Sequence, residues 1–243
     1  MDIIHTVEDV PIKLGIPWYY RLPYYTTSMF IIYIVIFMQP SMNYPEPSFF
    51  NLAFYSYYGH EYSREAYRWY TYSLLHLNVV HIASNMYNLI IFGTLVEINA
   101  LAPGAAAINM ISILGGAFTT AAYSQITNRP VILVGASGGI FGLLSAQIGN
   151  IVINWNQMDL VQRIIYTSVI SCAVISEIVV DIVLYNPLIS YADHVGGFIF
   201  GIFAGFCFMK NSAKHTWLKS LRIGSAIVLS SLLVTGIMNT CFM

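Results

Sequence analysis

The amino-acid sequence predicts an all-α polytopic membrane protein with about seven transmembrane helices. Hydrophobic residues make up 57% of the 243-residue chain and charged residues only 9%. The mean hydropathy is +0.67, which is too apolar for an ordinary soluble domain. Long uncharged windows separate the charged residues, and a bilayer core of about 30 Å needs roughly 20 helical residues. The windows therefore indicate repeated membrane crossings.

The charge spacing predicts where each span lies. A further apolar stretch, 164–185, is interrupted only by Glu177 and Asp181 and supplies one more helix. The expected spans cover 24–39, 71–97, 104–126, 131–153, 162–184, 189–209 and 222–242. No small-x-small cleavage site follows the first of them, so we interpret it as a span and not as a signal peptide.

One membrane domain is the simplest organisation of these spans. We expect a cytosolic segment at 1–23, a six-helix core at 24–209 with a long luminal loop at 40–70, and a cytosolic linker plus a seventh helix at 210–243. Seven spans place the two ends on opposite sides of the membrane. The formal net charge of −1 points to no particular partner.

The positive residues predict the orientation. With a cytosolic N-terminus, seven of the ten Lys and Arg residues lie on the cytosolic side: Lys13, Arg21, Arg163, Lys210, Lys214, Lys219 and Arg222. Only Arg64, Arg68 and Arg129 lie on the other side. Because cytoplasmic loops carry an excess of Lys and Arg, the N-terminus is expected in the cytosol and the C-terminus in the lumen or at the exterior.

The fourth span contains a serine between glycines. The stretch "VGASGGIFGLL" places Ser137 next to Gly138 and two residues after Gly135. A Gly-x-Ser-x-Gly pattern is typical of hydrolases whose serine sits on a turn after a strand. In a membrane helix the same residues are equally typical of a close helix contact, so the motif alone leaves both interpretations open.

Polar groups inside a membrane are expensive and usually functional or tightly paired. In the second span, His81 and Asn85 are four residues apart and share one helical face, about 6 Å from each other. In the sixth span, His194 precedes Gly197 and Gly201. Glycines at a spacing of four form a flat stripe on which another helix can pack backbone to backbone.

Matching depth suggests that these residues meet. Ser137 and His194 each lie seven residues beyond a proline, Pro130 or Pro187, so each side chain is expected about 10 Å below the start of its helix. A serine hydroxyl becomes a useful nucleophile only when a base takes its proton, and a neutral histidine is such a base. Neighbouring donors would then stabilise the oxyanion that forms.

These motifs together resemble the rhomboid family of intramembrane serine proteases, over about residues 60–210. The matching stretches are "HIASN" with His81 and Asn85, "GASGG" with Ser137, and "HVGGFIFG" with His194. Further agreement comes from Arg68, from "GTLVE" ending at Glu97, and from "NWNQM" after the fourth span. The order of these pieces on separate spans is more specific than any one of them.

The resemblance implies a role for each matching residue. Ser137 is the expected nucleophile and His194 the general base of a Ser–His dyad. The expected oxyanion donors are His81, Asn85 and the backbone amide of Ser137. Structural or accessory roles fall to Gly135, Gly138, Gly197, Gly201, Arg68 and Glu97.

The resemblance also implies the protein's surroundings. The substrates would be single-pass transmembrane proteins, cut within or near the luminal end of their membrane helix. The enzyme would reside among membrane lipids in the secretory pathway or plasma membrane, as in the eukaryotic branch with six core spans plus a seventh. We expect no cofactor, no metal ion and no nucleic-acid partner.

The chain departs from the family pattern in places, and two alternative functions stay open. Tyr67 precedes Arg68 where the family usually has tryptophan, and Asp193 precedes His194 where a small residue is common. Adjacent helical residues point about 100° apart, so Asp193 is not expected to orient His194. The alternatives are a catalytically silent rhomboid-like protein that binds membrane clients, and a transporter that uses intramembrane histidines and carboxylates.

The two carboxylates of the fifth span carry a prediction of their own. Glu177 and Asp181 share a helical face, and Asp181 lies six residues before Pro187, at about the depth of the dyad. We expect them to face the water-filled cavity or the side where substrate enters, with at least one carboxyl protonated when it is not solvated. Glu177→Gln and Asp181→Asn should therefore alter the rate of substrate cleavage or its pH profile. Unchanged cleavage at every pH would indicate a purely structural pair.

Overall fold

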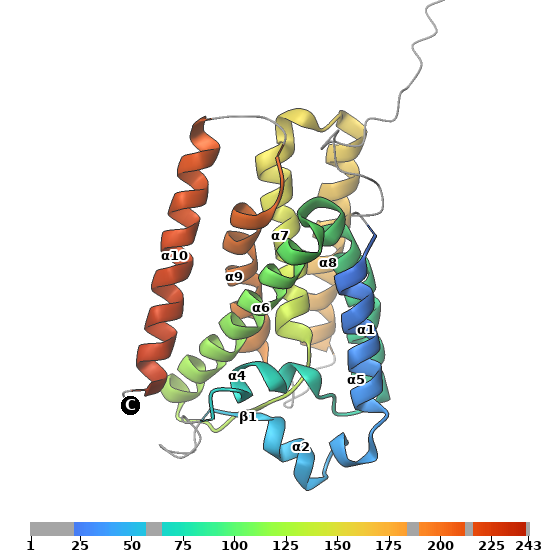
Figure 1. Cartoon of the computed structure of the whole chain (residues 1–243), viewed down its shortest axis with the longest axis vertical. Coiled ribbons are helices and arrows are strands. Elements are labelled where there is room, and N and C mark those ends of the chain that lie inside the picture. Colours follow the sequence, from blue (N-terminus) through green and yellow to red (C-terminus); the bar gives the residue numbers. More distant parts are fainter. Residues whose placement is uncertain (1–21, 57–64, 184–189, 212–215, 242–243) are drawn as a thin grey trace, which may run out of the picture.

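Helices form nearly all of the described structure (Figure 1). The computed structural model describes residues 22–56, 65–183, 190–211 and 216–241. In chain order the elements are α1 (Tyr24–Phe37), the 3-10 turn η2 (Pro40–Met42), α2 (Pro47–Leu52), β1 (Phe54–Tyr55), α4 (Arg68–Thr71), the 3-10 turn η3 (Tyr72–Leu74), α5 (Val79–Asn88), the π-helical turn η4 (Leu89–Gly93), α6 (Thr94–Thr127), β2 (Ile132–Leu133), α7 (Ser137–Asn154), the 3-10 turn η5 (Trp155–Gln157), α8 (Leu160–Val183), α9 (Tyr191–Phe208) and α10 (Thr216–Cys241).

The long helices form a bundle in which α7 takes an inner position. α7 packs against α6, α8 and α9, while α10 lies outside α9 and α1 lies beside α6 (Figure 1). By length and hydropathy, three described helical runs could cross a membrane: Val79–Thr127, Tyr191–Phe208 and Thr216–Met238. α7 is not among them, because glycine and buried polar residues such as Gln147 and Asn150 occupy many of its positions.

The run Val79–Thr127 is two helical legs joined by a turn. Leu101 has φ 62° and ψ 169°, which breaks the helical path inside α6. Pro103 comes two residues later, where the first turn of a new leg tolerates a residue without an N–H. The sequence-based boundaries at 97 and 104 therefore enclose a real turn.

Two expected spans begin later than predicted. In the span expected at 71–97, the long helix begins only at Val79. Asn78 caps this helix, α5, by accepting a hydrogen bond from the His81 amide at 2.9 Å. Residues 71–78 instead include the turn η3 and an extended segment. The span expected at 131–153 becomes helical only at Ser137, because 132–133 form β2, which pairs antiparallel with β1.

The start of α1 is held by a carboxylate from α6. Glu97 is fully buried. Its Oε1 accepts a hydrogen bond from the Tyr25 amide at 2.7 Å, and its Oε2 accepts bonds from the Thr26 amide and hydroxyl, both at 2.9 Å. The first amides of a helix have no partner within the helix and favour negative charge. Glu97 therefore supplies the cap that α1 lacks in its own sequence.

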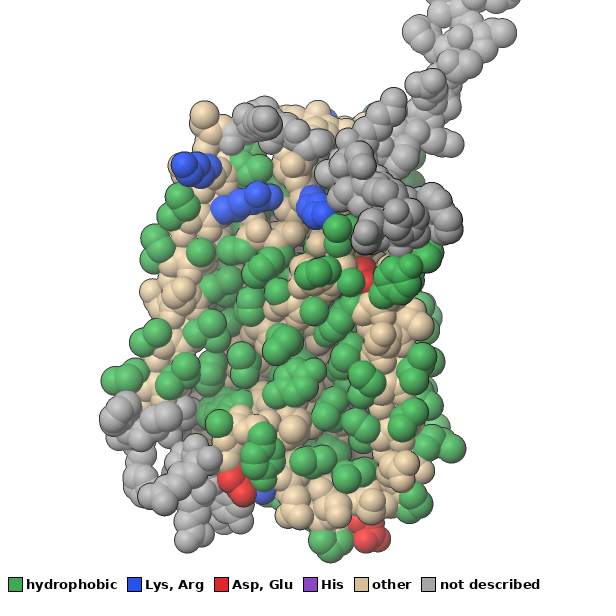
Figure 2. All heavy atoms as spheres, viewed as in Figure 1, with side chains coloured by type: hydrophobic (Ala, Val, Ile, Leu, Met, Phe, Trp, Pro, Cys, Tyr) green, Lys and Arg blue, Asp and Glu red, His purple; other side chains and the backbone are tan. Residues whose placement is uncertain are grey.

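The outer surface is apolar around the middle of the molecule. Figure 2 shows hydrophobic side chains covering this band, with Lys and Arg side chains near one end of the visible face. Exposed apolar residues of α1, α8 and α10 include Ile31, Val35, Ile164, Val169, Ile227 and Val234. At the basic end Arg222 of α10 donates to the Met209 carbonyl at 2.8 Å. The band is suited to lipid, in agreement with an integral membrane protein.

Glycines bring α7 and α9 into backbone contact. A β-carbon at Gly197 would lie 2.0 Å from the Gly138 carbonyl oxygen, and one at Gly201 would lie 2.4 Å from the Gly142 Cα. At Gly205 the nearest atom would be the Ala146 Cα at 2.8 Å. No side chain fits in these places, so the stripe expected from the sequence lies in the tightest interface of the bundle.

This interface predicts a sharp difference between two glycine substitutions. Gly197→Ala should lower the free energy of unfolding by about 1–3 kcal/mol, because the new methyl group overlaps α7 backbone. Gly224→Ala is the matched control, since a β-carbon there meets nothing within 4 Å. The control should be neutral or stabilise α10 by about 0.5–1 kcal/mol. Thermal melting of the detergent-solubilised variants measures both, and equal melting temperatures would contradict the packing argument.

Candidate active site

Ser137 is the first residue of α7 and follows a short strand and a turn. Gly135 in this turn has φ 120°, a conformation that glycine adopts at little cost. Its amide donates to the Tyr72 carbonyl at 3.0 Å, which ties the turn to η3. The expectation that Ser137 lies about 10 Å inside a helix is therefore wrong. The segment before it descends as strand and turn, and Ser137 stands at the helix end.

His81 and Asn85 of α5 both face the turn that precedes Ser137. A β-carbon at Gly135 would come within 2.8 Å of His81 Nε2 and 3.7 Å of Asn85 Nδ2. The Leu77 amide lies 3.4 Å from His81 Nδ1, as a donor to it. In a neutral imidazole with Nδ1 as acceptor, Nε2 carries the proton. His81 thus directs an N–H toward the turn.

Asn85 adds a second donor at the same place. Its side chain is only 6% exposed, and among the described residues no acceptor lies within hydrogen-bond reach of Nδ2. A buried donor without a partner is costly and calls for an explanation in the chemistry of its site. A transient negative charge beside Gly135 would satisfy it.

His194 of α9 lies along the face of α7 that carries Ser137. Its ring stacks on Phe141, with ring centroids 4.2 Å apart and an interplanar angle of 14°. Phe141 is one turn after Ser137, and residues four apart share a helical face. The stacking holds the imidazole beside the serine's helix. The spacing of Phe141 from Ser137 could have suggested this support from the sequence.

The Ser137 hydroxyl is bonded to Asp193 in this structure. Its Oγ donates to Asp193 Oδ2 at 3.2 Å. The Tyr72 hydroxyl lies 2.8 Å from Asp193 Oδ1, and the carboxylate is 2% exposed. Sequence reasoning weighed Asp193 only against His194 and missed both of these contacts.

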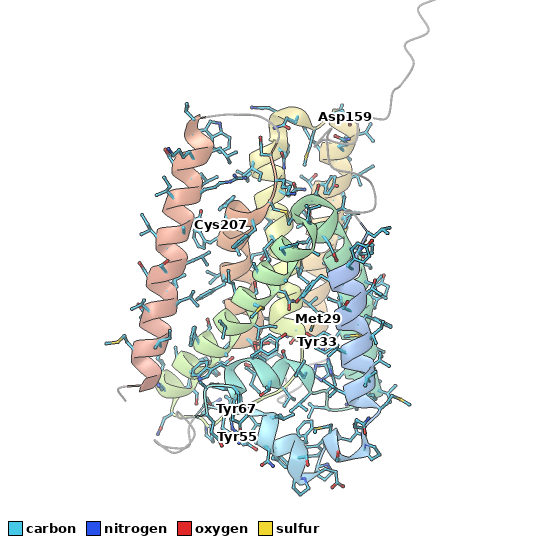
Figure 3. The ribbon with its side chains drawn as sticks, viewed as in Figure 1. Met29, Tyr33, Tyr55, Tyr67, Asp159 and Cys207 are labelled. Carbon is cyan, nitrogen blue, oxygen red and sulfur yellow. The ribbon has the colours of Figure 1, made fainter. Side chains whose placement is uncertain are left out.

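Arg68 holds together the loop between the first two spans, at the site end of the bundle. Arg68 is buried, with only 5% of the residue exposed. It donates to the Phe50 and Ala53 carbonyls at 2.7 and 2.8 Å. Its charge lies over the rings of Tyr55 and Tyr67, with the guanidinium carbon 5.4 and 5.5 Å from the ring centroids. Figure 3 shows these two tyrosines together at one end of the molecule.

The positions of the fifth-span carboxylates relative to the site stay a prediction. Glu177 and Asp181 belong to α8, but their side chains lie outside the part of the chain whose side chains the structure describes. The four glycines expected to have structural or accessory roles lie in different parts of the site. Gly135 borders the donors, Gly138 and Gly197 join the two helices, and Gly201 extends that junction.

A helical membrane bundle with a serine, two histidines and a buried amide at one end defines a polytopic membrane protein with a cluster of polar residues at that end. A family model, the rhomboid domain, matches residues 63–211. This is more than half of the chain, and the protein belongs to the rhomboid family.

Several curated proteins are similar to the chain. RHOMBOID-like protein 1 of Arabidopsis thaliana is 32% identical over 148 residues, which is 60% of this chain and 35% of that protein. Rhomboid-related protein 2 of Mus musculus is 27% identical over 162 residues, 62% of this chain and 52% of that protein. Rhomboid-related protein 1 of Caenorhabditis elegans is 25% identical, over 71% of this chain and 48% of that protein. The chain thus spans between about a third and a half of these relatives.

Proposed function

We propose that the protein is an intramembrane serine endopeptidase that uses Ser137 as nucleophile and His194 as general base. The observation that carries the proposal is the pair of donors beside Gly135, of which Asn85 keeps a buried amide without an acceptor among the described residues. Membership of the rhomboid family supports the same reaction class. Neither observation depends on the other.

The proposed chemistry proceeds in two balanced steps. Ser137 Oγ attacks the substrate carbonyl while its proton passes to His194, and the tetrahedral intermediate collapses to an acyl-enzyme as His194 returns the proton to the leaving amine. Water then attacks the ester, with His194 again taking and returning a proton. The products are two peptides, and Ser137 regains its hydroxyl.

The developing oxyanion would lie beside Gly135. The imidazole Nε2 of His81 and the amide Nδ2 of Asn85 both approach this point, and the first amides of α7 have no partner within the helix. Donors fixed in advance in a site with little water lower the energy of charge formed in the transition state. The buried donors are thus stabilised only during the reaction.

The substrates we propose are single-pass transmembrane proteins in the surrounding lipid. A peptide bond inside a membrane helix is hydrogen bonded and shielded from water, so the substrate helix must unravel locally near its end. The site lies at the end opposite the Lys and Arg residues of α10, the end where α4 and β1 are found (Figure 1). With basic residues cytosolic, this end faces the lumen or the exterior of a secretory or plasma membrane.

Activity-based labelling tests the proposed nucleophile. The detergent-solubilised protein should react with a fluorophosphonate, forming an Oγ–P bond at Ser137 with loss of fluoride. Ser137→Ala should abolish labelling, and it should also stop cleavage of tagged single-span proteins co-expressed with the enzyme. Ser145→Ala is the matched control, because Ser145 is fully buried on the same helix and donates only within it, to the Gly142 carbonyl.

The two alternative functions predict different outcomes. A catalytically silent protein that binds membrane clients would retain co-purifying single-span proteins, yet wild type and Ser137→Ala would be equally unlabelled. A transporter would move solute across vesicles with Ser137→Ala as well as with wild type. Labelling of wild type together with loss in Ser137→Ala contradicts both.

The two donors beside Gly135 predict that Asn85 affects the cleavage rate. Asn85→Ala should lower the cleavage rate on the order of 10²–10³ through kcat, because one oxyanion donor is lost. Asn99→Ala is the control: Asn99 is also buried, but its amide donates to the Leu95 carbonyl near the other end of the bundle. If both variants lose activity in proportion to their loss of thermal stability, the donor role of Asn85 is wrong.

A further inference from the structure

We propose that Asp193 is a positioning residue that holds the Ser137 hydroxyl in a resting orientation and that must release it before His194 can take its proton. This inference rests on the proposed function. The structure carries it through the hydrogen bond from Ser137 Oγ to Asp193 Oδ2 at 3.2 Å. The same side chain stands at the junction of η3, α6, α7 and α9.

The Asp193 carboxylate fits into a space that glycines on two other helices leave open. A β-carbon at Gly116 of α6 would lie 2.1 Å from Asp193 Oδ1, and one at Gly138 of α7 would lie 2.5 Å from the same oxygen. Any larger residue at either position would displace the carboxylate. The fit between two glycines and one acid, on three different helices, indicates a built position and not an incidental rotamer.

Hydrogen bonds from Tyr72 and to Ser190 also orient the Asp193 side chain. The Tyr72 hydroxyl lies 2.8 Å from Oδ1 and 2.8 Å from the Ile113 carbonyl of α6, which fixes the phenol between two acceptors. At the other side, the Asp193 amide donates to the capping hydroxyl of Ser190 at 3.3 Å. With backbone and Oδ1 both held, Oδ2 is left to face Ser137.

One proton decides between two acceptors. A serine hydroxyl has a single O–H, so Ser137 cannot donate to Asp193 and to the His194 imidazole at once. The bond to Asp193 is the one that the structure shows, and a molecule in this resting orientation cannot pass the proton to His194. The apparent rate of acylation therefore falls to the fraction of molecules that is competent.

The isosteric substitution Asp193→Asn tests this directly. Asparagine preserves the shape and can accept the Tyr72 hydrogen bond through Oδ1, while its Nδ2 faces Ser137 and donates to Oγ. The serine proton is then available to His194. Fluorophosphonate labelling of Ser137 should accelerate about tenfold or more, in the inactivation rate constant and not in the affinity for the probe. With a transmembrane substrate the gain should appear in kcat with KM unchanged.

An increase in rate cannot come from structural damage, so its direction separates positioning from mere support. Asp159→Asn is the matched control, because Asp159 lies at the other end of the bundle (Figure 3), where its Oδ1 accepts from the Gln162 amide. It should label at the wild-type rate. Asp193→Asn labelling no faster than wild type would overturn the inference while leaving the proposed function intact.

A second variant acts on the orientation of the carboxylate. Tyr72→Phe removes the phenol that holds Oδ1, so Asp193 should hold Ser137 less firmly and labelling should accelerate. This arm decides the question if Asp193→Asn does not fold, and labelling no faster than wild type would contradict the inference. Absence of labelling in wild type and in all variants would overturn the proposed function, and the inference with it.

Discussion

The contact between α7 and α9 is the constraint on which the rest of the molecule depends. Gly197 lies so close to the Gly138 carbonyl that only a hydrogen atom fits at the Cα. At that separation, His194 and Asp193 reach the first turn of α7 from a neighbouring helix. One more carbon atom in the interface would separate the groups that the proposed chemistry requires to meet.

The segment around Ser137 combines a motif that is typical of soluble hydrolases with the requirements of a lipid environment. A two-residue strand, a glycine turn and a helix beginning at Ser137 reproduce locally the strand–turn–helix arrangement of a Gly-x-Ser-x-Gly motif. The strand pairs with β1, so its backbone groups are satisfied within the protein, as non-helical segments at membrane depth require. The chain thus places Ser137 after a turn whose neighbouring strand is paired within the protein.

The sequence was sufficient for the fold class, for the turn near residue 101 and for the family, because each depends on local composition or on ordered motifs. It failed where contacts join distant segments. Nothing in the spacing of Tyr72 and Asp193, 121 residues apart, indicates that they meet. It also extended the helix over 131–136, because apolar residues next to glycine suit both a helix and a strand with a turn. The direction in which the side chains of Glu177 and Asp181 face remains a prediction.

The Glu97 cap of α1 bears on how the bundle is made. α1 lies 71 or more residues upstream of the carboxylate that accepts its first amides, so this helix leaves the ribosome well before its cap exists. Until α6 is synthesised, those amides depend on water or lipid headgroups at the membrane surface. The first span is therefore completed by a later one, and biogenesis of the protein must tolerate an unfinished helix in the bilayer during translation.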